Sequence, residues 1–448
     1  MTHIKIKNGH DFLFNKDINK TIKKMNVPSL IKLHPTDFRG IKPKLILKEG
    51  DSVFKGAPVY YCKNNPEILF SSPLAGRIEK INYGERRSIK SIEILTSQAQ
   101  SNEYYTQLVD ASTLVDPVEI VQVLCKAGLW PLIRSKPFSK IANPSIMPKS
   151  IFISTNPTAP FAPDLEFVLK DKIKDMQKGI DILYKIANCD IHLINKIDSD
   201  IFKNIENVLE HTCSGSHPSG NTGVHIFNID PIKNKEEVVW YISPQALCLI
   251  GQLFLYKDID FKKVISIAGD GFNKNQYCEI YYGAPIDNIL SSNKSKDDYI
   301  LISGDLLSGA KTSYSKALCF YDETLSSIKS KGDREFLGWI MPGIRKYTLT
   351  KAFLSSFINI NKYKFTSLKN GSIRSIVPIG NIEKYIPYNI LITPLIKAIL
   401  AKDIDTMEKL GIYECSPEDF SICTYVDASK MNISSIIQDG LDYMEIEG

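Results

Sequence analysis

The first hundred residues carry short apolar runs separated by turn residues rather than a helical pattern. Between residues 40 and 95 the runs are broken by turns at Gly50-Asp51, Pro73–Gly76 and Gly84, which predicts strands joined by tight turns. No stretch of this block has the 3.6-residue spacing of a useful helix. We therefore expect residues 1–100 to form a small all-β barrel or sandwich.

Strands and helices alternate between residues 101 and 257. Asp116-Pro117-Val118-Glu119 supplies an N-cap acid, a proline in the first turn and a glutamate at the capping-box position. This predicts a helix that ends at Gly128 and buries Val118, Val121 and Leu124. Apolar runs at 150–154, 191–195 and 237–243 predict strands, and Pro163-Asp164 predicts one long helix reaching Ile186. The alternation is typical of a parallel α/β domain.

The last part of the chain changes pattern twice. Residues 258–312 return to short strands with glycine turns, which predicts a β-rich module for ligand binding or docking. From residue 313 onward we expect mainly helices. Thr393-Pro394 predicts one helix, Ser416-Pro417 predicts another, and Ile433 to Met444 lies in the last. The first of these is expected to bury Leu395, Ile396, Ile399 and Leu400.

Composition and charge restrict the function classes. The 448 residues include 55 basic and 50 acidic side chains, and a net charge of +5 is too mild to indicate nucleic-acid binding. It would not oppose docking beside an anionic membrane. The N-terminal sequence has no apolar core of a signal peptide, and the apolar runs at 247–256 and 386–401 are too short or interrupted to span a bilayer. We expect a soluble, cytoplasmic protein.

Local motifs for chemistry are few. The nine cysteines are scattered and include no C-x-x-C pair, which indicates reduced thiols and no local cluster motif. The sequence contains no GxGxxG, GxSxG or HExxH. Residues 211–225, HTCSGSHPSGNTGVH, hold possible zinc ligands and phosphate-cradling glycines, but neither the spacing nor the context fits such a site. A structured, turn-rich connection is the better interpretation.

The stretch KAGLWPLIRSKPFSK, residues 126–140, is the most distinctive part of the sequence. It combines two large aromatic residues, two prolines and four cations, too interrupted for a helix interior and too apolar for an ordinary loop. Such a mixture suits a partner surface or an amphiphilic ligand. A loop that buries Trp130 in its own core explains the stretch equally well.

Several segments resemble, in order, the A subunits of the bacterial Na+-translocating NADH:quinone reductases. They are GDSVFKG, SSPLAGRIEKI, AGLWPLIRSKPFSK, VISIAGDGFN, GAPI, LISGDLLSG, FLGWIMPGIRKYTLTKAFLS, GSIRSIVPIGNIEKYIP and ICTYV. The resemblance runs almost end to end. It implies an α/β multidomain protein: a lipoyl-like barrel-sandwich hybrid at 1–100, a Rossmann-like α/β domain at 101–257, an SLBB β-grasp module at 258–312 and a C-terminal helical domain at 313–448.

The resemblance also implies a role in a complex. The A subunit is the cofactor-free member of a six-subunit pump that oxidises NADH, passes electrons through flavins and iron–sulfur centres in its partners, reduces ubiquinone and exports Na+. It docks on the membrane-embedded B subunit, on the cytoplasmic side of the bacterial inner membrane, near the quinone-reaction end. The isolated chain is expected to have no activity.

Departures from flavin-bearing relatives, the Rnf peripheral subunit and the flavin subunit of respiratory complex I, strengthen the expectation of no cofactor. Their glycine-rich loop corresponds to residues 126–138, where Gly128 alone remains and Pro131 lacks an N–H. Their cysteine cluster is represented by Cys415 and Cys423, too few for a four-iron cluster. We predict no flavin, bound NADH, iron–sulfur cluster or other metal in this chain.

Four residues of the 126–140 stretch are candidates for contact with quinone or with another subunit. Trp130 and Phe138 would be walls, and Arg134 and Lys140 would donate to carbonyl oxygens. No residue is nominated as catalytic. Two alternatives stay open: a flavin and iron–sulfur subunit of an Rnf-like dehydrogenase, and a lone β-grasp protein that binds a small ligand. A visible spectrum and co-purification with five further subunits separate these alternatives from the pump subunit.

Overall fold

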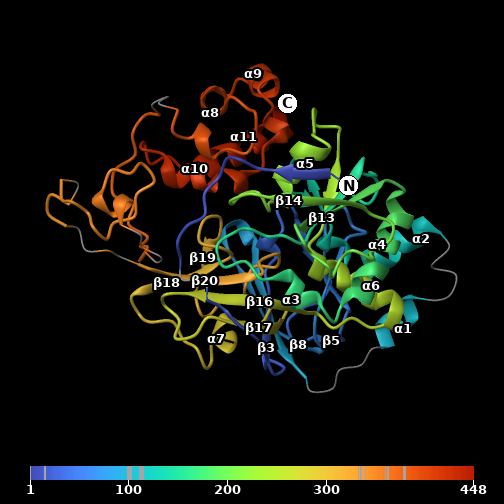
Figure 1. Ribbon diagram of the computed structural model, residues 1–448. Helices are drawn as coiled ribbons and strands as arrows, with labels where there is room; N and C mark the ends of the chain where they lie inside the picture. Colours follow the sequence, from blue (N-terminus) through green and yellow to red (C-terminus); the bar gives the residue numbers. More distant parts are fainter. Residues whose placement is uncertain are drawn as a thin grey trace.

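The computed structural model describes residues 2–14, 17–97, 103–109, 116–330, 332, 335–338, 340–358, 360, 363–376 and 380–448. Within these residues the strands form four sheets, and most helices cover the largest of them (Figure 1). The predicted α/β multidomain architecture is confirmed.

Two small antiparallel sheets share one core and form the β block. Their strand orders are β3-β9-β8-β5 and β4-β6-β7. The strands are β3 (Leu30–Leu33), β4 (Pro43–Leu45), β5 (Ser52–Val53), β6 (Pro58–Cys62), β7 (Leu69–Ser71), β8 (Gly76–Tyr83) and β9 (Ile89–Thr96). Ile31, Val59 and Ile92 are fully buried between the sheets, as alternation of inward and outward residues requires.

A seven-stranded sheet forms the centre of the α/β domain, in the order β1-β14-β13-β12-β15-β10-β11. The strands are β1 (Thr2–Lys5), β10 (Arg134–Lys136), β11 (Lys140–Ile141), β12 (Ser150–Ser154), β13 (Asp190–Lys196), β14 (Leu209–Ser214) and β15 (Val239–Tyr241). The first five in the order are parallel, whereas β10 and β11 form an antiparallel hairpin at one edge. The 126–140 stretch therefore ends as part of this sheet.

Helices of the α/β domain begin and end largely where capping chemistry predicts. They are α1 (Glu103–Leu108), α2 (Pro117–Lys126), α3 (Leu165–Leu169), α4 (Ile173–Ala187), α5 (Thr222–Ile229) and α6 (Pro244–Tyr256). The Asp116 carboxylate accepts the N–H of Val118 at 2.9 Å, and Gly128 follows α2 with φ of +71°. The predicted start and stop of α2 are confirmed. The prediction that α2 buries Val118 is wrong, because Val118 is 61% exposed. Ile120 and Leu124 are buried.

The single long helix expected after Asp164 is wrong. The chain breaks into α3 and α4, with the N–H of Lys172 donating to the carbonyl oxygen of Leu169 at 2.8 Å in the turn between them. The apolar spacing continues across the break because both helices bury one face. α4 lies directly against α6, so closely that a Cβ on Gly179 would sit 2.4 Å from the carbonyl oxygen of Leu247. This close packing sets the direction of α4 independently of α3.

A six-stranded sheet, the centre of what is called here the six-stranded module, has the order β19-β18-β20-β16-β17-β2. Its strands and short helix are β2 (Asn19–Lys24), β16 (Lys262–Gly269), β17 (Gln276–Tyr281), α7 (Ile286–Ile289), β18 (Tyr299–Ser303), β19 (Ala310–Lys311) and β20 (Thr324–Lys329). β2 comes from the N-terminal segment, and β20 lies beyond residue 312. Like β1 in the seven-stranded sheet, β2 pairs outside the two small sheets of the β block.

Four C-terminal helices cover one face of the seven-stranded sheet, and α4 and α6 cover the other (Figure 1). They are α8 (Ile392–Ala401), α9 (Ile404–Lys409), α10 (Ser421–Val426) and α11 (Ile433–Glu447). Leu395, Ile396 and Ile399 are buried as predicted, but Leu400 is exposed. None of the helices in the described residues is long and apolar enough to cross a membrane.

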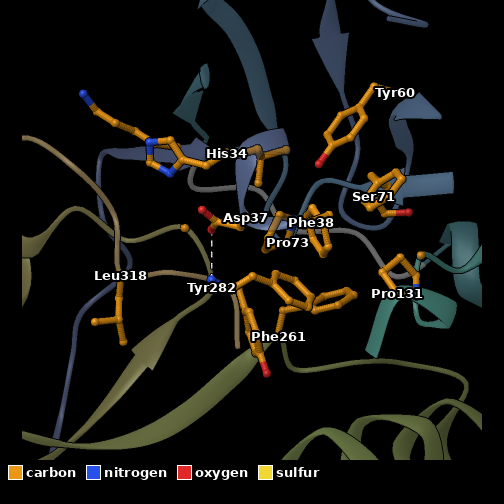
Figure 2. Close-up of a pocket in the computed structure, with 16 residues that line it drawn as sticks. His34, Asp37, Phe38, Tyr60, Ser71, Pro73, Pro131, Phe261, Tyr282 and Leu318 are labelled. Carbon is orange, nitrogen blue, oxygen red and sulfur yellow. Dashed lines mark hydrogen bonds between the residues drawn. The ribbon is translucent and has the colours of Figure 1, made fainter. Parts of the chain in front are cut away.

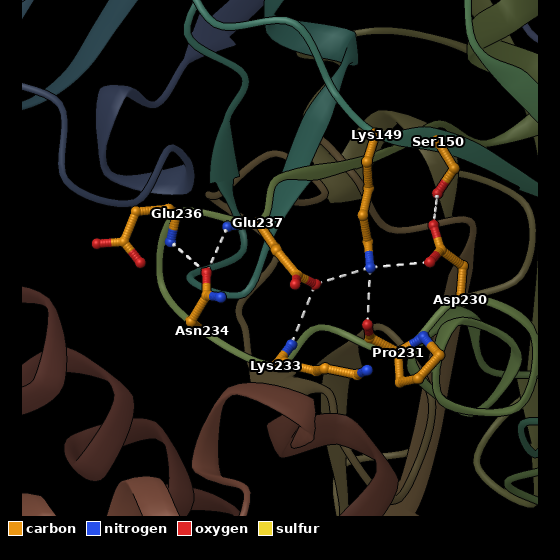
Figure 3. A network of polar contacts seen from close by, with 8 residues as sticks. All are labelled: Lys149, Ser150, Asp230, Pro231, Lys233, Asn234, Glu236 and Glu237. Atoms are coloured by element: carbon orange, nitrogen blue, oxygen red, sulfur yellow. Dashed lines mark hydrogen bonds and ion pairs between the residues drawn. The ribbon is translucent and has the colours of Figure 1, made fainter.

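Lys149, just before β12, ties that strand to the connection between α5 and β15 (Figure 3). Its ammonium contacts the carboxylates of Asp230 and Glu237, each at 2.8 Å, and donates to the carbonyl oxygen of Pro231 at 2.7 Å. Asp230 also accepts from Ser150 Oγ at 2.6 Å. This network fixes β12 beside β15, the strand on which the β10–β11 hairpin is paired.

Candidate functional site

A cavity of about 50 Å³ lies where the β block, the α/β domain and the six-stranded module meet (Figure 2). The β block contributes β3, the 3-10 helix Pro35–Asp37, β6 and β7. The α/β domain contributes Gly128 and Pro131, and the module contributes residues that flank β16, β17 and β20. Junctions between domains are common places for small-molecule sites.

Packed aromatic rings form one continuous part of the cavity wall. Phe38 of the β block packs against Phe70 and Phe320, each with a centroid separation of 4.7 Å. Tyr60 stacks on Phe70 at 4.5 Å, and Tyr282 packs on Phe320 at 5.0 Å. The rings thus form a continuous apolar lining contributed by two domains.

Asp37 is the acidic group of this cavity. Its Oδ2 accepts the backbone N–H of Phe320 at 2.9 Å, which joins the β block to the segment before β20 (Figure 2). Burial raises the pKa of Asp37 to about 6, against the opposing effect of the Phe320 hydrogen bond. Because of this shift, a fraction of the carboxyl groups keeps its proton close to neutral pH.

His34 and Ser71 are among the further polar residues that line the cavity. Burial, followed by the charges of Lys316 and Lys32, lowers the pKa of His34 to about 4, so the imidazole is neutral at pH 7. Ser71 Oγ is buried without a hydrogen-bond partner among the described residues. An unpaired buried hydroxyl is costly and is available to a bound polar group.

The buried side chain of Lys263 also holds the segment that carries Phe320. Lys263 Nζ donates to the carbonyl oxygens of Phe320 at 2.7 Å and Cys319 at 3.2 Å. Burial lowers the pKa of Lys263 and raises those of the nearby carboxyl groups of Asp322 and Glu323. Lys263 and Asp37 therefore hold one short peptide segment between them, which positions the Phe320 ring.

The structure places Trp130 in the core. Its side chain is 0% exposed, its indole N–H donates to the carbonyl oxygen of Ala142 at 2.7 Å, and its ring packs edge-on against Trp240 at 5.4 Å. The neighbouring Pro131 does line the cavity, and its carbonyl oxygen accepts from Tyr321 Oη at 2.7 Å.

The cations of the stretch point toward other parts of the chain. The Arg134 guanidinium lies between the rings of Tyr241 and Tyr321, at 4.4 and 4.3 Å from their centroids. Lys136 pairs with Glu418 at 2.9 Å and Lys140 pairs with Glu445 at 2.6 Å. Each of these contacts ties the hairpin to the module, to the neighbouring strand or to the C-terminal region.

Phe138 also faces the C-terminal region. Its ring lies 6.3 Å from that of Tyr413, and its carbonyl oxygen accepts from Arg39 at 2.9 Å. The four candidates Trp130, Arg134, Phe138 and Lys140 thus do not converge on the cavity in the described residues. Their assignment as quinone contacts or as contacts with other subunits stays a prediction.

Residues 211–225 comprise the end of β14, a turn-rich connection and the start of α5. His192 Nδ1 lies 3.0 Å from His211 Nε2, His217 Nδ1 lies 3.2 Å from Thr158 Oγ1, and His225 Nε2 lies 2.8 Å from the carbonyl oxygen of Ser219. Within the described ranges no three His, Cys, Asp or Glu side chains converge as metal ligands.

Sequence reasoning missed Asp37, Phe38 and Phe320 as functional candidates. The only local signal is an acid beside a phenylalanine in HPTDF, residues 34–38, just before the strands predicted from residue 40. The module's contribution, CFY at 319–321, falls at the start of the part expected to be helical.

Known proteins match this chain over its full length. Three family descriptions match in order: "NqrA N-terminal barrel-sandwich hybrid domain" at 4–97, "NqrA second alpha/beta domain" at 115–257 and "NQRA C-terminal domain" at 264–314. The A subunit of the "Na(+)-translocating NADH-quinone reductase" of Neisseria meningitidis serogroup A is 31% identical over 447 residues, covering 99% of this chain and 100% of the relative. The corresponding protein of Histophilus somni strain 2336 is 32% identical over 448 residues, with the same coverage. A solved NAD+-reducing [NiFe]-hydrogenase in the air-oxidized state aligns with a TM-score of 0.36 and 11% identity over 52% of this chain and 51% of that one, too low a likeness to bear on fold or function.

Proposed function

The chain belongs to the NqrA family, the A subunits of the Na+-translocating NADH-quinone reductases, and on that premise we propose that it is the peripheral, cofactor-free member of the complex near the quinone-reaction end. In this proposal it docks on the membrane-embedded B subunit, on the cytoplasmic side of the bacterial inner membrane, within a complex of six subunits. NADH, flavins and iron–sulfur centres are handled by the partners. The isolated chain has no activity, because oxidoreduction belongs to the complex.

The aromatic cavity at the three-domain junction is the observation that carries the quinone part of the proposal. A quinone has an apolar ring and two carbonyl acceptors, so it needs flat apolar walls and hydrogen-bond donors. Phe38, Tyr282 and Phe320 supply walls. The protonated fraction of Asp37 and the unpaired hydroxyl of Ser71 supply donors.

The size of the cavity requires it to open. An apolar cavity of roughly 150 Å³ accommodates benzene, and this one measures about 50 Å³. Its walls belong to three domains, and the polar contacts at the cavity itself include Asp37 to Phe320 and Tyr321 to Pro131. In the proposal these domains separate slightly in the assembled complex, and Trp130 and Arg134 support the walls from behind.

One local feature supports the absence of a flavin or nucleotide at residues 126–140, and another supports the absence of an iron–sulfur cluster in the C-terminal region. A Cβ on Gly128 would lie 2.4 Å from Ser71 Oγ, so the open face of the one remaining glycine is filled by the chain itself. Cys415 and Cys423 are buried, and each thiol donates to a backbone carbonyl oxygen, of Gly411 and of Ile382. Burial raises the pKa of both thiols, which disfavours the thiolate that a cluster requires.

The test is quinone kinetics in the assembled complex. Leu318→Phe adds volume to the cavity wall and is expected to raise the KM for a short-chain quinone about tenfold, the equivalent of about 1.4 kcal/mol, while the KM for NADH stays unchanged. Leu95→Phe, on the exposed side of β9, is the matched control. Co-purification of the tagged chain with the B subunit checks assembly. Unchanged quinone KM in a fully assembled Leu318→Phe complex contradicts the quinone role, and failure to co-purify contradicts the docking role.

A further inference from the structure

Residues 335–376, here called the apolar-cationic segment, combine a concentrated positive charge with exposed apolar side chains. They include seven basic residues and one acidic residue, a formal charge of +6, whereas the whole chain carries +5. The remaining residues are together close to neutral. Large apolar side chains of the segment are also strongly exposed, among them Phe336 at 90% and Phe357 at 85%. Ile340, Met341 and Ile344 are more than half exposed as well.

The base of this segment is firmly attached. Phe365 packs on Phe14 with centroids 4.4 Å apart, and Tyr347 contacts His10 Nε2 through its hydroxyl. The backbone N–H of Tyr363 donates to the carbonyl oxygen of Leu13 at 3.1 Å. Among the described aromatic residues, Tyr347 and Phe365 thus anchor the segment on the N-terminal strand connection, whereas Phe336 and Phe357 are strongly exposed.

The exposed part is also held in shape by its own contacts. Lys346 Nζ pairs with Glu335 at 2.6 Å and donates to the carbonyl oxygen of Gly338 at 2.6 Å. The N–H of Leu354 donates to the carbonyl oxygen of Pro342 at 2.9 Å. Figure 1 shows this orange segment reaching away from the body of the molecule. Its apolar side chains are displayed by a folded loop rather than by a frayed end.

Glu335, the one acid of the segment, is paired with Lys346. The segment therefore has no further acidic residue to pair with its other cations. Arg345, Lys351, Lys364, Lys369 and Arg374 are all exposed. Exposed apolar side chains beside such cations match the chemistry of an anionic bilayer surface, where rings enter the headgroup region and cations meet lipid phosphates.

We propose that the apolar-cationic segment binds the surface of an anionic lipid bilayer. The inference rests on the proposed function only for the side of the membrane. On the cytoplasmic side, loops of membrane proteins carry an excess of Lys and Arg. A segment of charge +6 is repelled by such loops and attracted by anionic headgroups, so charge favours lipid over the face of a membrane protein.

Vesicle co-sedimentation of the full chain tests the proposal. We expect binding to vesicles of phosphatidylcholine mixed with phosphatidylglycerol, little binding to phosphatidylcholine alone, and weakening as salt rises. Arg345→Glu with Lys351→Glu is expected to weaken binding at least about 25-fold, because each basic residue near an anionic surface strengthens binding about fivefold. Lys48→Glu with Lys63→Glu, exposed residues of the β block, is the control with the same net charge.

The apolar contribution has its own variant pair. Phe336→Ser with Phe357→Ser is expected to lose most binding at high salt, where charge is screened, while Phe54→Ser with Tyr83→Ser keeps it. Because the substituted side chains are exposed, we expect every variant to keep the thermal unfolding midpoint of the parent chain, and a variant must do so for its binding to be compared. These measurements need only the full chain, so they can fail while co-purification and quinone kinetics succeed.

Three outcomes would overturn the proposal. Equal binding to neutral and anionic vesicles, or no binding to either, would exclude recognition of an anionic lipid surface. If the control Lys48→Glu with Lys63→Glu weakens vesicle binding equally, the binding comes from the net charge of the chain and not from this segment. Binding to detergent-solubilised membrane proteins of the complex that depends on Phe336 and Phe357, without any binding to vesicles, assigns the segment to a protein interface instead.

Discussion

The stretch 126–140 and the apolar-cationic segment have similar composition and opposite surroundings. Both mix aromatic residues and cations. In the first, Trp130 is fully buried and the cations at 134, 136 and 140 each meet a ring or a carboxylate. In the second, Phe336 and Phe357 are exposed, and Arg345 and Lys351 are exposed beside them.

The difference comes from what lies elsewhere in the chain. The carboxylates of Glu418 and Glu445 and the rings of Tyr241 and Tyr321 are brought to the first stretch by other elements. In the second segment, the acid Glu335 is already paired with Lys346. An aromatic and cationic sequence therefore indicates an external partner only when the fold supplies no internal one.

The largest expected effect separates the two regions by stability. Trp130→Ala removes a buried indole and its hydrogen bond, and should cost about 3–5 kcal/mol in the free energy of unfolding. Phe336→Ala, at an exposed site, should change it by less than about 0.5 kcal/mol. Denaturant unfolding of the two variants measures both values. Similar losses at the two sites would remove the distinction between an inward and an outward region.

The next effect concerns the cations. Lys136 is 2% exposed and Glu418 keeps 38% exposure, so Lys136→Met leaves a partly buried carboxylate unpaired beside Asp419. We expect a loss of about 3 kcal/mol, near the low end for a broken buried pair. Lys351→Met should be neutral within about 0.5 kcal/mol. The same unfolding experiment decides, and a neutral Lys136→Met would show that the hairpin is not tied to the C-terminal region through this pair.

A smaller, pH-dependent effect is expected at the cavity beside the first stretch. The folded pKa of Asp37, about 6, lies above its ordinary value of 3.8, so folded chains hold a proton that unfolded chains release between those pH values. Stability contributed by Asp37 therefore falls as pH rises from about 4 to about 6. Relative to the parent, Asp37→Asn should gain about 2 kcal/mol across this window, since partial exposure reduces the full shift.

Unfolding free energies at several pH values, with Asp270→Asn as an exposed control, check this prediction. Other titrating groups cancel in the difference between parent and variant. A pH-independent difference for Asp37→Asn would mean that Asp37 is ionised normally in the fold, and would remove it as a donor to quinone.

Local chemistry determined what could be predicted from the sequence. The start of α2 was predictable because its cap is local: the Asp116 carboxylate accepts the N–H of Val118, two residues later. The break between α3 and α4 was not, because packing of α4 on α6 imposes it. The cavity was beyond sequence reasoning because Asp37 and Phe320, 283 positions apart, meet only in the fold. The motif FLGWIMPGIRKYTLTKAFLS contributed to the family resemblance, but the exposure of its described side chains was not predicted.

Amide hydrogen exchange of the full chain, with and without anionic vesicles, tests the central contrast most directly. We predict slow exchange at residues 129–142 in both conditions, because these amides lie in the sheet edge and core. We predict new protection at 335–358 only when vesicles of phosphatidylcholine and phosphatidylglycerol are present. Unchanged fast exchange at 335–358 on those vesicles, or vesicle-dependent protection at 129–142 instead, would contradict the contrast between the two regions.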